Sequence, residues 1–82
     1  MMTLVSYDIQ EDRIRGKIFE ACKDYGLAHF QYSAFIGKLN HNRRDELKQR
    51  IKKTLGQKKG KILVLPICDK DVRLMEVIEV RD

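Results

Sequence analysis

Several features that mark particular protein classes are scarce or missing in this sequence. It has no tryptophan, one proline and two cysteines, Cys22 and Cys68, which lie far apart and form no C-x-x-C pair. This spacing argues against a disulfide framework or a zinc module and is typical of core thiols in a reducing cytoplasm. No apolar run approaches the roughly 18 residues that a membrane span needs, and no basic and apolar signal peptide is visible. We therefore expect a cytoplasmic protein with no membrane association.

The chain is short, and its 82 residues predict a single domain spanning residues 1–82. A hydrophobic fraction of 43% is sufficient for a globular core. A domain of this size buries only roughly 60–65% of its unfolded surface, so its core is marginal. Because association with a second copy would add buried surface, a homodimer is a natural expectation.

Positive charge is concentrated in one part of the chain. The whole sequence carries a net charge of +5, and residues 41–61 alone hold nine basic and two acidic side chains. A block of one sign favours a polyanionic partner, most commonly DNA and/or RNA. The alternative is a solvated helix face whose lysines serve solubility. We favour the polyanion interpretation because acids are not interleaved with the bases. The candidate nucleic-acid-binding residues of this block are Arg43, Arg44, Lys48, Lys52 and Lys53.

Apolar periodicity divides the chain into strands and helices. Strands are expected at 3–9, 27–39, 62–68 and 74–80, helices at 11–25 and 41–55, and a turn at 69–73. The strands at 3–9 and 62–68 are apolar on both faces and are expected to be covered on both. The order is β-α-β-β-α-β if 27–39 breaks into a hairpin, and β-α-β-α-β-β if it does not. Either order fits the α/β (α+β) class, as a ferredoxin-like sandwich with two helices on one face of an antiparallel or mixed sheet.

An ionisable residue ends the first, otherwise apolar strand. Asp8 stands where ligands and metals meet the sheet in many α/β proteins. With about equal weight, Asp8 is a capping residue for the helix that follows. Three basic residues of that helix, Arg13, Arg15 and Lys17, are candidate phosphate contacts or partners of nearby carboxylates.

Four motifs together resemble the small, universal CRISPR-associated endonuclease family, the subunit that partners the CRISPR integrase in spacer acquisition. They are V-S-Y-D-I at 5–9, Y-G-L at 25–27, Q-Y-S-A-F-I-G at 31–37 and V-L-P-I-C at 64–68. The resemblance runs from about Leu4 to Cys68. It implies a ferredoxin-like βαββαβ fold with an antiparallel sheet, and a two-fold dimer in which the last strand packs on the sheet of the partner.

The resemblance also assigns expected roles to residues. Asp8 matches the key acid of the family, and the two copies in a dimer would share one Mg²⁺. Tyr7, Ser33 and Phe35 match the other catalytic-site positions. Arg15 and Lys17 match basic positions of the first helix, whereas His29 stands where the family often has arginine. A neutral imidazole is a weaker phosphate contact than a guanidinium.

Three functions are open at this point. The first is a metal-dependent endonuclease that hydrolyses single-stranded RNA or double-stranded DNA around Asp8. The second is a non-catalytic, DNA-binding dimeric scaffold that bridges integrase dimers. The third, without the resemblance, is an RNA-binding or toxin-like ferredoxin fold, although the aromatic-rich K/R-G-F-x-F strand of an RNA-recognition motif is missing.

Overall fold

Residues 1–80, which the computed structural model describes, contain four strands and three helices. The elements are β1 (Met2–Asp8), α1 (Asp12–Asp24), β2 (Ala28–Gln31), β3 (Ala34–Lys38), α2 (His41–Leu55), β4 (Lys61–Ile67) and α3 (Asp69–Leu74). A turn at Tyr32 and Ser33 splits the predicted strand 27–39 into the β2–β3 hairpin. The first of the two predicted orders, βαββαβ, is therefore confirmed.

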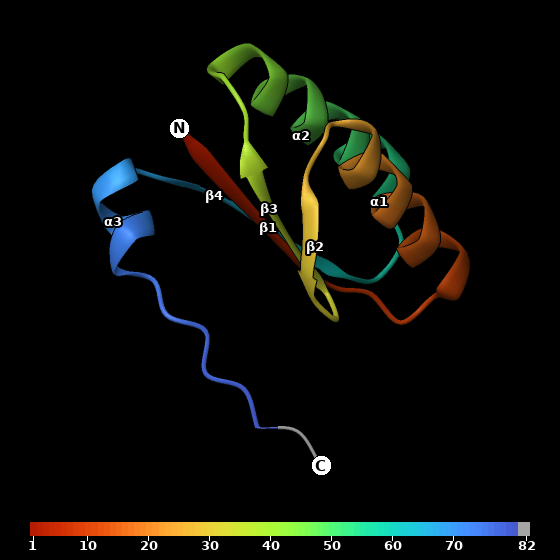
Figure 1. Cartoon of the computed structure of the whole chain (residues 1–82). Coiled ribbons are helices and arrows are strands. Elements are labelled where there is room, and N and C mark those ends of the chain that lie inside the picture. The colour runs from red at the N-terminus through yellow and green to blue at the C-terminus, as the bar shows by residue number, and fades with distance from the viewer. Residues whose placement is uncertain (81–82) are drawn as a thin grey trace.

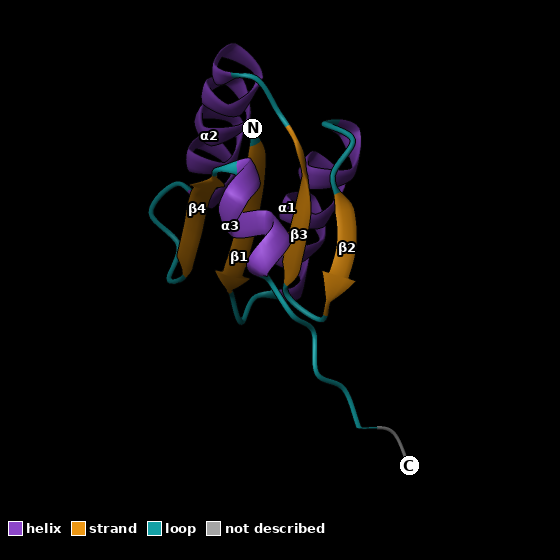
Figure 2. Cartoon of the chain, turned by 60° about the vertical axis from the view of Figure 1, so that its left-hand side comes forward, coloured by secondary structure: helices purple, strands orange, loops and turns teal. Residues whose placement is uncertain are grey.

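The sheet has the order β2-β3-β1-β4, and every neighbouring pair is antiparallel. Figure 1 shows α1 and α2 side by side on one face of this sheet, which is the predicted ferredoxin-like arrangement. Figure 2 shows α3 on the opposite side of the sheet. β1 lies in the centre between β3 and β4, and its end at Asp8 pairs with β4, two residues beyond its last pair with β3 at Ser6.

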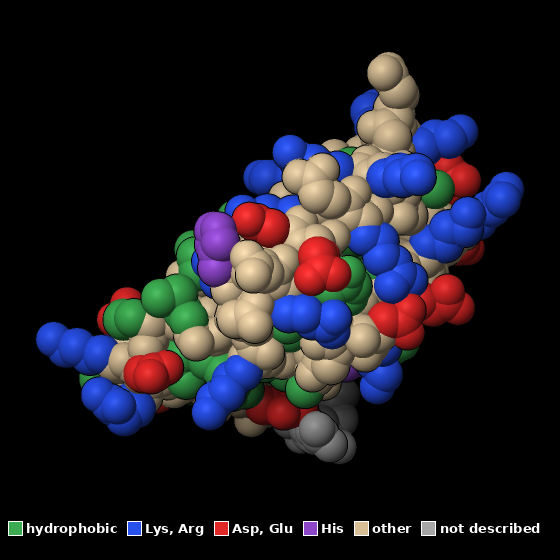
Figure 3. Space-filling model, turned by 90° about the horizontal axis from the view of Figure 1, so that it is seen from above, with side chains coloured by type: hydrophobic (Ala, Val, Ile, Leu, Met, Phe, Trp, Pro, Cys, Tyr) green, Lys and Arg blue, Asp and Glu red, His purple; other side chains and the backbone are tan. Residues whose placement is uncertain are grey.

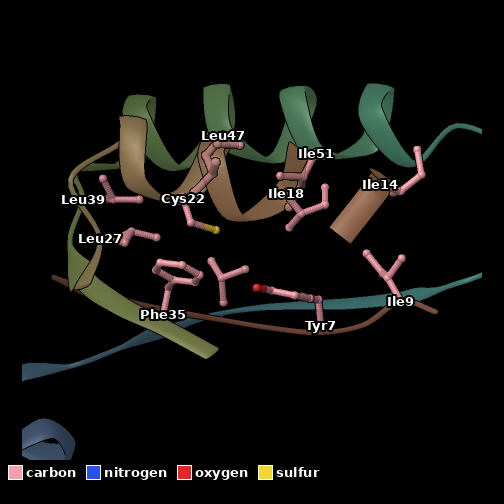
Figure 4. Packing of buried hydrophobic residues seen from close by; sticks show 12 residues of the cluster. Tyr7, Ile9, Ile14, Ile18, Cys22, Leu27, Phe35, Leu39, Leu47 and Ile51 are labelled. Carbon is pink, nitrogen blue, oxygen red and sulfur yellow. The ribbon is translucent and has the colours of Figure 1, made fainter. Parts of the chain in front are cut away.

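The core lies between the sheet and the two long helices (Figure 4). Val5 and Tyr7 of β1 and Phe35 of β3 point from the sheet toward Ile18 of α1 and Leu47 of α2, and all five side chains are buried. A glycine with positive φ follows each of these helices, with φ of 78° at Gly26, two residues after the end of α1, and 56° at Gly56, directly after α2. These ends direct the chain back toward the sheet.

The prediction that β1 and β4 are covered on both faces is wrong. In β1 only the alternate residues that face α1 and α2 are buried. In β4 the residues of the other face, including Leu63 and Leu65, are exposed. The physical reason is that α1 and α2 both lie on one side, and the six-residue α3 is too short to cover the other side. One apolar face of the sheet is thus open in the single chain.

The predicted turn at 69–73 and strand at 74–80 are also wrong for the single chain. Residues 69–74 form α3, whose first turn carries Asp69 and Asp71, where the helix dipole favours acids. Residues 75–80 form no strand. A strand needs a neighbour to pair its backbone groups, and this segment extends away from the sheet in Figure 1. Its apolar side chains are therefore exposed, with Ile78 86% and Val80 93% accessible.

Candidate functional site

Asp8 is the last residue of β1 and its side chain is exposed. It lies directly opposite Lys61, the first residue of β4. The loop between α2 and β4 comes close to this point. A Cβ atom placed on Gly60 would stand 3.0 Å from Cγ1 of Ile9 and 3.5 Å from the carbonyl oxygen of Asp8. A residue without a side chain is needed here for the loop to approach the end of β1.

The close approach creates a hollow that contains one acid and two bases. Asp8, Gln10, Lys59, Gly60 and Lys61 line a cavity of about 300 Å³. A second hollow of about 260 Å³ on the open face of the sheet is also lined by Asp8 and Lys61. The arrangement places a carboxylate, a metal ligand, beside two ammonium groups that can contact phosphates.

The donor set for a metal ion is incomplete in one chain. Within residues 1–80, no three His, Cys, Asp or Glu side chains lie close enough together to hold an ion. Magnesium is bound by a few carboxylates together with water and substrate phosphates, so one carboxylate is insufficient for a dedicated site. Asp8 therefore fits the predicted Mg²⁺ only if a second chain supplies another ligand.

Ser33 and Phe35 line neither of the two Asp8 hollows, and Tyr7 lines only the second. Tyr7 and Phe35 are buried, with ring centroids 6.4 Å apart, and point toward the helices (Figure 4). The backbone N–H of Tyr7 donates a hydrogen bond of 3.0 Å to the carbonyl oxygen of Ser33. Burial raises the pKa of the Tyr7 hydroxyl above its usual value. The geometry gives these residues a role in fixing the end of β1.

The three basic residues of α1 have different surroundings. Arg15 is half-buried, donates from Nη1 to the carbonyl oxygen of Ile9 at 3.2 Å, and forms an ion pair with Asp12. It lines a third hollow together with Tyr7, but Asp8 does not reach that hollow. Arg13 and Lys17 are exposed on the helix. One chain thus holds Arg15 in place without directing it at Asp8.

The basic residues of α2 fall into two groups. Those of the first group interact within the fold. Arg43 lies 4.4 Å from the ring centroid of Tyr25, and Arg44 is 3.5 Å from Nδ1 of His41. Lys48 and Arg50 pair with acids, Nζ of Lys48 at 3.6 Å from Asp45 and Nη2 of Arg50 at 2.9 Å from Asp24. Lys52 and Lys53 form the second group.

Both of these lysines are exposed in the last turn of α2 and form no ion pair within the part of the chain that the structure describes. The view toward α2 in Figure 3 shows Lys and Arg side chains across this surface with a few acids among them. The positive charge of α2 that forms no ion pair within the described residues therefore lies in its last turn.

Lys59 and Lys61 are site residues that the sequence analysis counted only as part of the basic block. They line the Asp8 hollow, whereas none of the candidate bases in α1 and α2 does. The predicted strand ranges could have revealed their position. Antiparallel pairing of 3–9 with 62–68 places the start of the second strand opposite the end of the first, beside Asp8. In the described region, 1–80, no helix combines the length and apolar character that crossing a membrane requires.

The fold and site define a small ferredoxin-like α+β domain with an exposed acid at the end of its central strand and a basic surface beside it. The family model described as CRISPR associated protein Cas2 matches residues 1–75. The chain therefore belongs to the Cas2 family, and the resemblance identified from its motifs is confirmed.

Known proteins similar to this chain support the same assignment. The CRISPR-associated endoribonuclease Cas2 of Desulforudis audaxviator is 60% identical over 80 residues, which are 98% of this chain and 76% of the relative. A Cas1/Cas2 endonuclease fusion of Thermoproteus tenax is 39% identical over 51 residues, 62% of this chain and 19% of the fusion. The crystal structure of Streptococcus pyogenes Cas2 matches with a TM-score of 0.81 at 23% identity, covering 96% of this chain and all of that one, which shows a shared fold.

Proposed function

We propose that this protein is a metal-dependent endonuclease of CRISPR spacer acquisition that acts as a homodimer and partners the CRISPR integrase. The observation that carries the proposal is the exposed carboxylate of Asp8 in one hollow with Lys59 and Lys61. Relatives named as endoribonucleases support the nuclease activity, and the Cas1/Cas2 fusion supports the integrase partnership. The substrate is a phosphodiester of single-stranded RNA or double-stranded DNA.

Each group of the site has a role that its surroundings support. Asp8 from each of two chains would hold a single Mg²⁺, and bound magnesium supplies polarisation of a phosphoryl oxygen and a more acidic water. Lys59 and Lys61 would bind the phosphates on either side of the scissile bond. Tyr7 and Phe35 would keep the end of β1, and with it Asp8, in a fixed position. Arg15 or Lys17 would contact the strand farther from Asp8.

The same chemistry and the open surfaces of the chain support a homodimer. Two carboxylates brought together repel each other, and a divalent cation between them removes that repulsion. The open face of the sheet, with exposed Leu63 and Leu65, and the apolar segment 75–80 offer surface that a second copy would cover. Magnesium should therefore favour dimerisation as well as cleavage.

The second candidate is a non-catalytic, DNA-binding scaffold that bridges integrase dimers. Two observations favour it: residues 1–80 contain no three-ligand metal cluster, and a relative is fused to the integrase subunit. A scaffold needs the basic surface and the dimer, but it does not need the carboxylate of Asp8.

Replacement of Asp8 by asparagine separates the two candidates. Asp8 is exposed and pairs through its backbone, so Asp8→Asn should keep the fold and the affinity for nucleic acid. If the protein is an enzyme, magnesium-dependent cleavage of labelled RNA or duplex DNA should fall on the order of a thousandfold or more. The control is Glu20→Gln, which removes one exposed acid of α1.

Full activity in Asp8→Asn would show that the reaction centre is elsewhere. If the wild type cleaves neither substrate with magnesium or manganese, but Asp8→Asn and wild type both support spacer integration, the scaffold is the correct function. Loss of cleavage in the Glu20→Gln control would mean that general loss of acidic charge, not the position of Asp8, explains the effect.

A further inference from the structure

One side chain of the Asp8 hollow has no role in the function proposed so far. The hollow of about 300 Å³ is lined by Asp8, Gln10, Lys59, Gly60 and Lys61. The proposed function assigns Asp8 to the metal and the two lysines to phosphates, and Gly60 has no side chain. Gln10 therefore remains as a group that a bound strand would meet and whose purpose is open.

Gln10 differs from the charged groups around it in its capacity for hydrogen bonds. An ionised carboxylate accepts and does not donate, an ammonium group donates and does not accept, and an amide does both. The phosphate oxygens of a nucleic-acid strand are acceptors, so they match the lysines and leave the carbonyl oxygen of Gln10 without a donor. The amide of Gln10 therefore fits a ligand group that can donate as well as accept.

The backbone on both sides of Gln10 is held by the fold. The side chain of Ile9 is buried in the core, and its carbonyl oxygen accepts a hydrogen bond from Nη1 of Arg15 at 3.2 Å. The carbonyl oxygen of Glu11 accepts from the backbone N–H of Arg15 at 3.0 Å. The backbone thus carries Gln10 to the hollow at a fixed point.

The side chain of Gln10 is available to a ligand. It is exposed, and its amide forms no hydrogen bond within residues 1–80. Packing of the chain therefore gives no reason for an amide at this position. Its two N–H donors and its carbonyl acceptor can all turn toward a group in the hollow.

The short distance along the chain between Gln10 and Asp8 limits which part of a nucleotide the amide can meet. Two residues span at most about 7 Å, so Gln10 stands close to the carboxylate at which a phosphate would be held. In RNA the 2′-hydroxyl and the 3′-phosphate are attached to adjacent carbons of one ribose. The 2′-hydroxyl both donates and accepts, and it is the group by which a protein distinguishes RNA from DNA.

We propose that Gln10 is a specificity-determining residue that forms a hydrogen bond with the 2′-hydroxyl of the nucleotide held at Asp8, so that the site favours RNA over DNA. The inference rests on the proposed function, because it places a nucleic-acid strand at Asp8, and it selects between the two sugars that this function leaves open. A DNA strand has no hydroxyl at this position and leaves the amide to water. Since Gln10 is exposed and water can replace the missing partner, the preference is modest.

The test compares three labelled oligonucleotides of one sequence: RNA, DNA, and RNA in which fluorine replaces every 2′-hydroxyl. The fluoro strand keeps a ribose-like sugar shape but has no O–H to donate, so it separates the hydroxyl from the shape of the sugar. Gln10→Leu removes the amide at a similar volume. The matched control is Gln57→Leu, because Gln57 is an exposed glutamine of the α2–β4 loop that does not line the hollow. Fluorescence anisotropy gives the affinity for each strand, and magnesium-dependent cleavage is measured on the same samples.

We expect wild type and Gln57→Leu to bind RNA about 2- to 10-fold more tightly than the fluoro and DNA strands, and Gln10→Leu to lose this preference. Equal affinity of the wild type for RNA and the fluoro strand, or a preference that Gln10→Leu retains, would overturn the inference even if the wild type cleaves RNA. A preference that Gln57→Leu also loses would overturn it as well, since the effect would not belong to the hollow. A wild type that shows the preference, loses it in Gln10→Leu and cleaves no strand would support the contact with ribose and reject the nuclease.

Discussion

Asp8 and Lys61 are directly opposed residues at the end of the antiparallel β1–β4 pair. Neither side chain forms an ion pair within residues 1–80. A carboxylate and an ammonium group therefore stand in one hollow with both charges available to a ligand. This combination matches a substrate that brings both a cation and phosphates, and it makes the lysines of the hollow the first residues to test.

Neutralising these lysines should weaken nucleic-acid binding in a salt-dependent way. Each phosphate contact to duplex DNA releases about 0.9 counterion. The double variant Lys59→Gln/Lys61→Gln should therefore make the plot of log affinity against log salt shallower by up to about 1.8, as measured by fluorescence anisotropy between 50 and 200 mM salt. The control Lys70→Gln removes an exposed lysine of α3. An equal slope in the double variant and the wild type would remove both lysines from the binding surface.

The two groups of bases on α2 should respond differently to substitution. Lys52→Gln/Lys53→Gln should weaken binding to unrelated sequences about equally, because these side chains form no ion pair within the described residues, and should affect stability only through the helix dipole, which cations in the last turn of α2 complement. Arg43→Gln should also lower the free energy of unfolding by about 0.5–1 kcal/mol, since it loses the contact with the Tyr25 ring. Urea unfolding and anisotropy on the same samples separate the two effects. Unchanged affinity in the lysine variant at moderate salt would make this end of α2 a solvated face.

Local sequence signals were sufficient to predict much of the fold. The apolar stripe of α1, the cap at Asn40 and the two terminal glycines are local features, and the structure contains them: Oδ1 of Asn40 accepts from the backbone N–H of Arg43 at 2.8 Å. The central position of β1 was also predictable, because a largely apolar strand belongs inside a sheet.

The errors concern features that depend on the neighbours of a segment. Apolar residues on both faces of β4 predict burial, yet exposure depends on which faces the helices cover. Residues 75–80 have strand-like composition, but a strand forms only when another strand is available. For the same reason the sequence located Asp8 but not its neighbours Lys59 and Lys61, which reach it through strand register and the close approach at Gly60.

The buried thiol of Cys22 should make stability depend on pH in the alkaline range. Burial raises the pKa of Cys22 from about 9.0 to about 11 because the thiolate is poorly solvated in the core. Below pH 9 the Cys22 thiol keeps its proton in both the folded and the unfolded chain, so the stability that depends on this proton is fully present. Between pH 9 and 11 the unfolded chain loses the proton first, so the free energy of unfolding should fall by about 2–3 kcal/mol.

Urea unfolding of wild type and Cys22→Ala at pH 8, 9, 10 and 10.5 measures this effect as a difference. Tyr7, whose pKa is raised first by burial and then by the charge of Cys22, is present in both proteins, so the part of its contribution that comes from burial cancels. Cys68→Ser is the matched control, because Cys68 is the exposed cysteine. Parallel curves of unfolding free energy against pH for wild type and Cys22→Ala would show that the Cys22 thiol does not cause the loss of stability.

The segment 75–80 should be required for dimerisation. β4 is an edge strand, and a groove of about 290 Å³ lies beside it, lined by the apolar residues Ile51, Leu55, Ile62 and Val64 and by Lys48 and Lys52. The segment offers exposed Val77 and Ile78 next to Glu76, so it complements this groove in both polarity and charge. Burying these side chains against a second chain would remove apolar surface from water on both.

We therefore expect the full chain to be a dimer in light scattering and a chain ending at Leu74 to have half that mass. Since β1 to β4 and the core contain none of the deleted residues, the shorter chain should retain its helical circular dichroism signal. Val77→Asp/Ile78→Asp tests the same contact at full length, with Lys70→Gln, an exposed residue outside the segment, as the control. A monomeric wild type, or a dimer that survives both the truncation and the double substitution, would show that residues 75–80 do not hold two chains together.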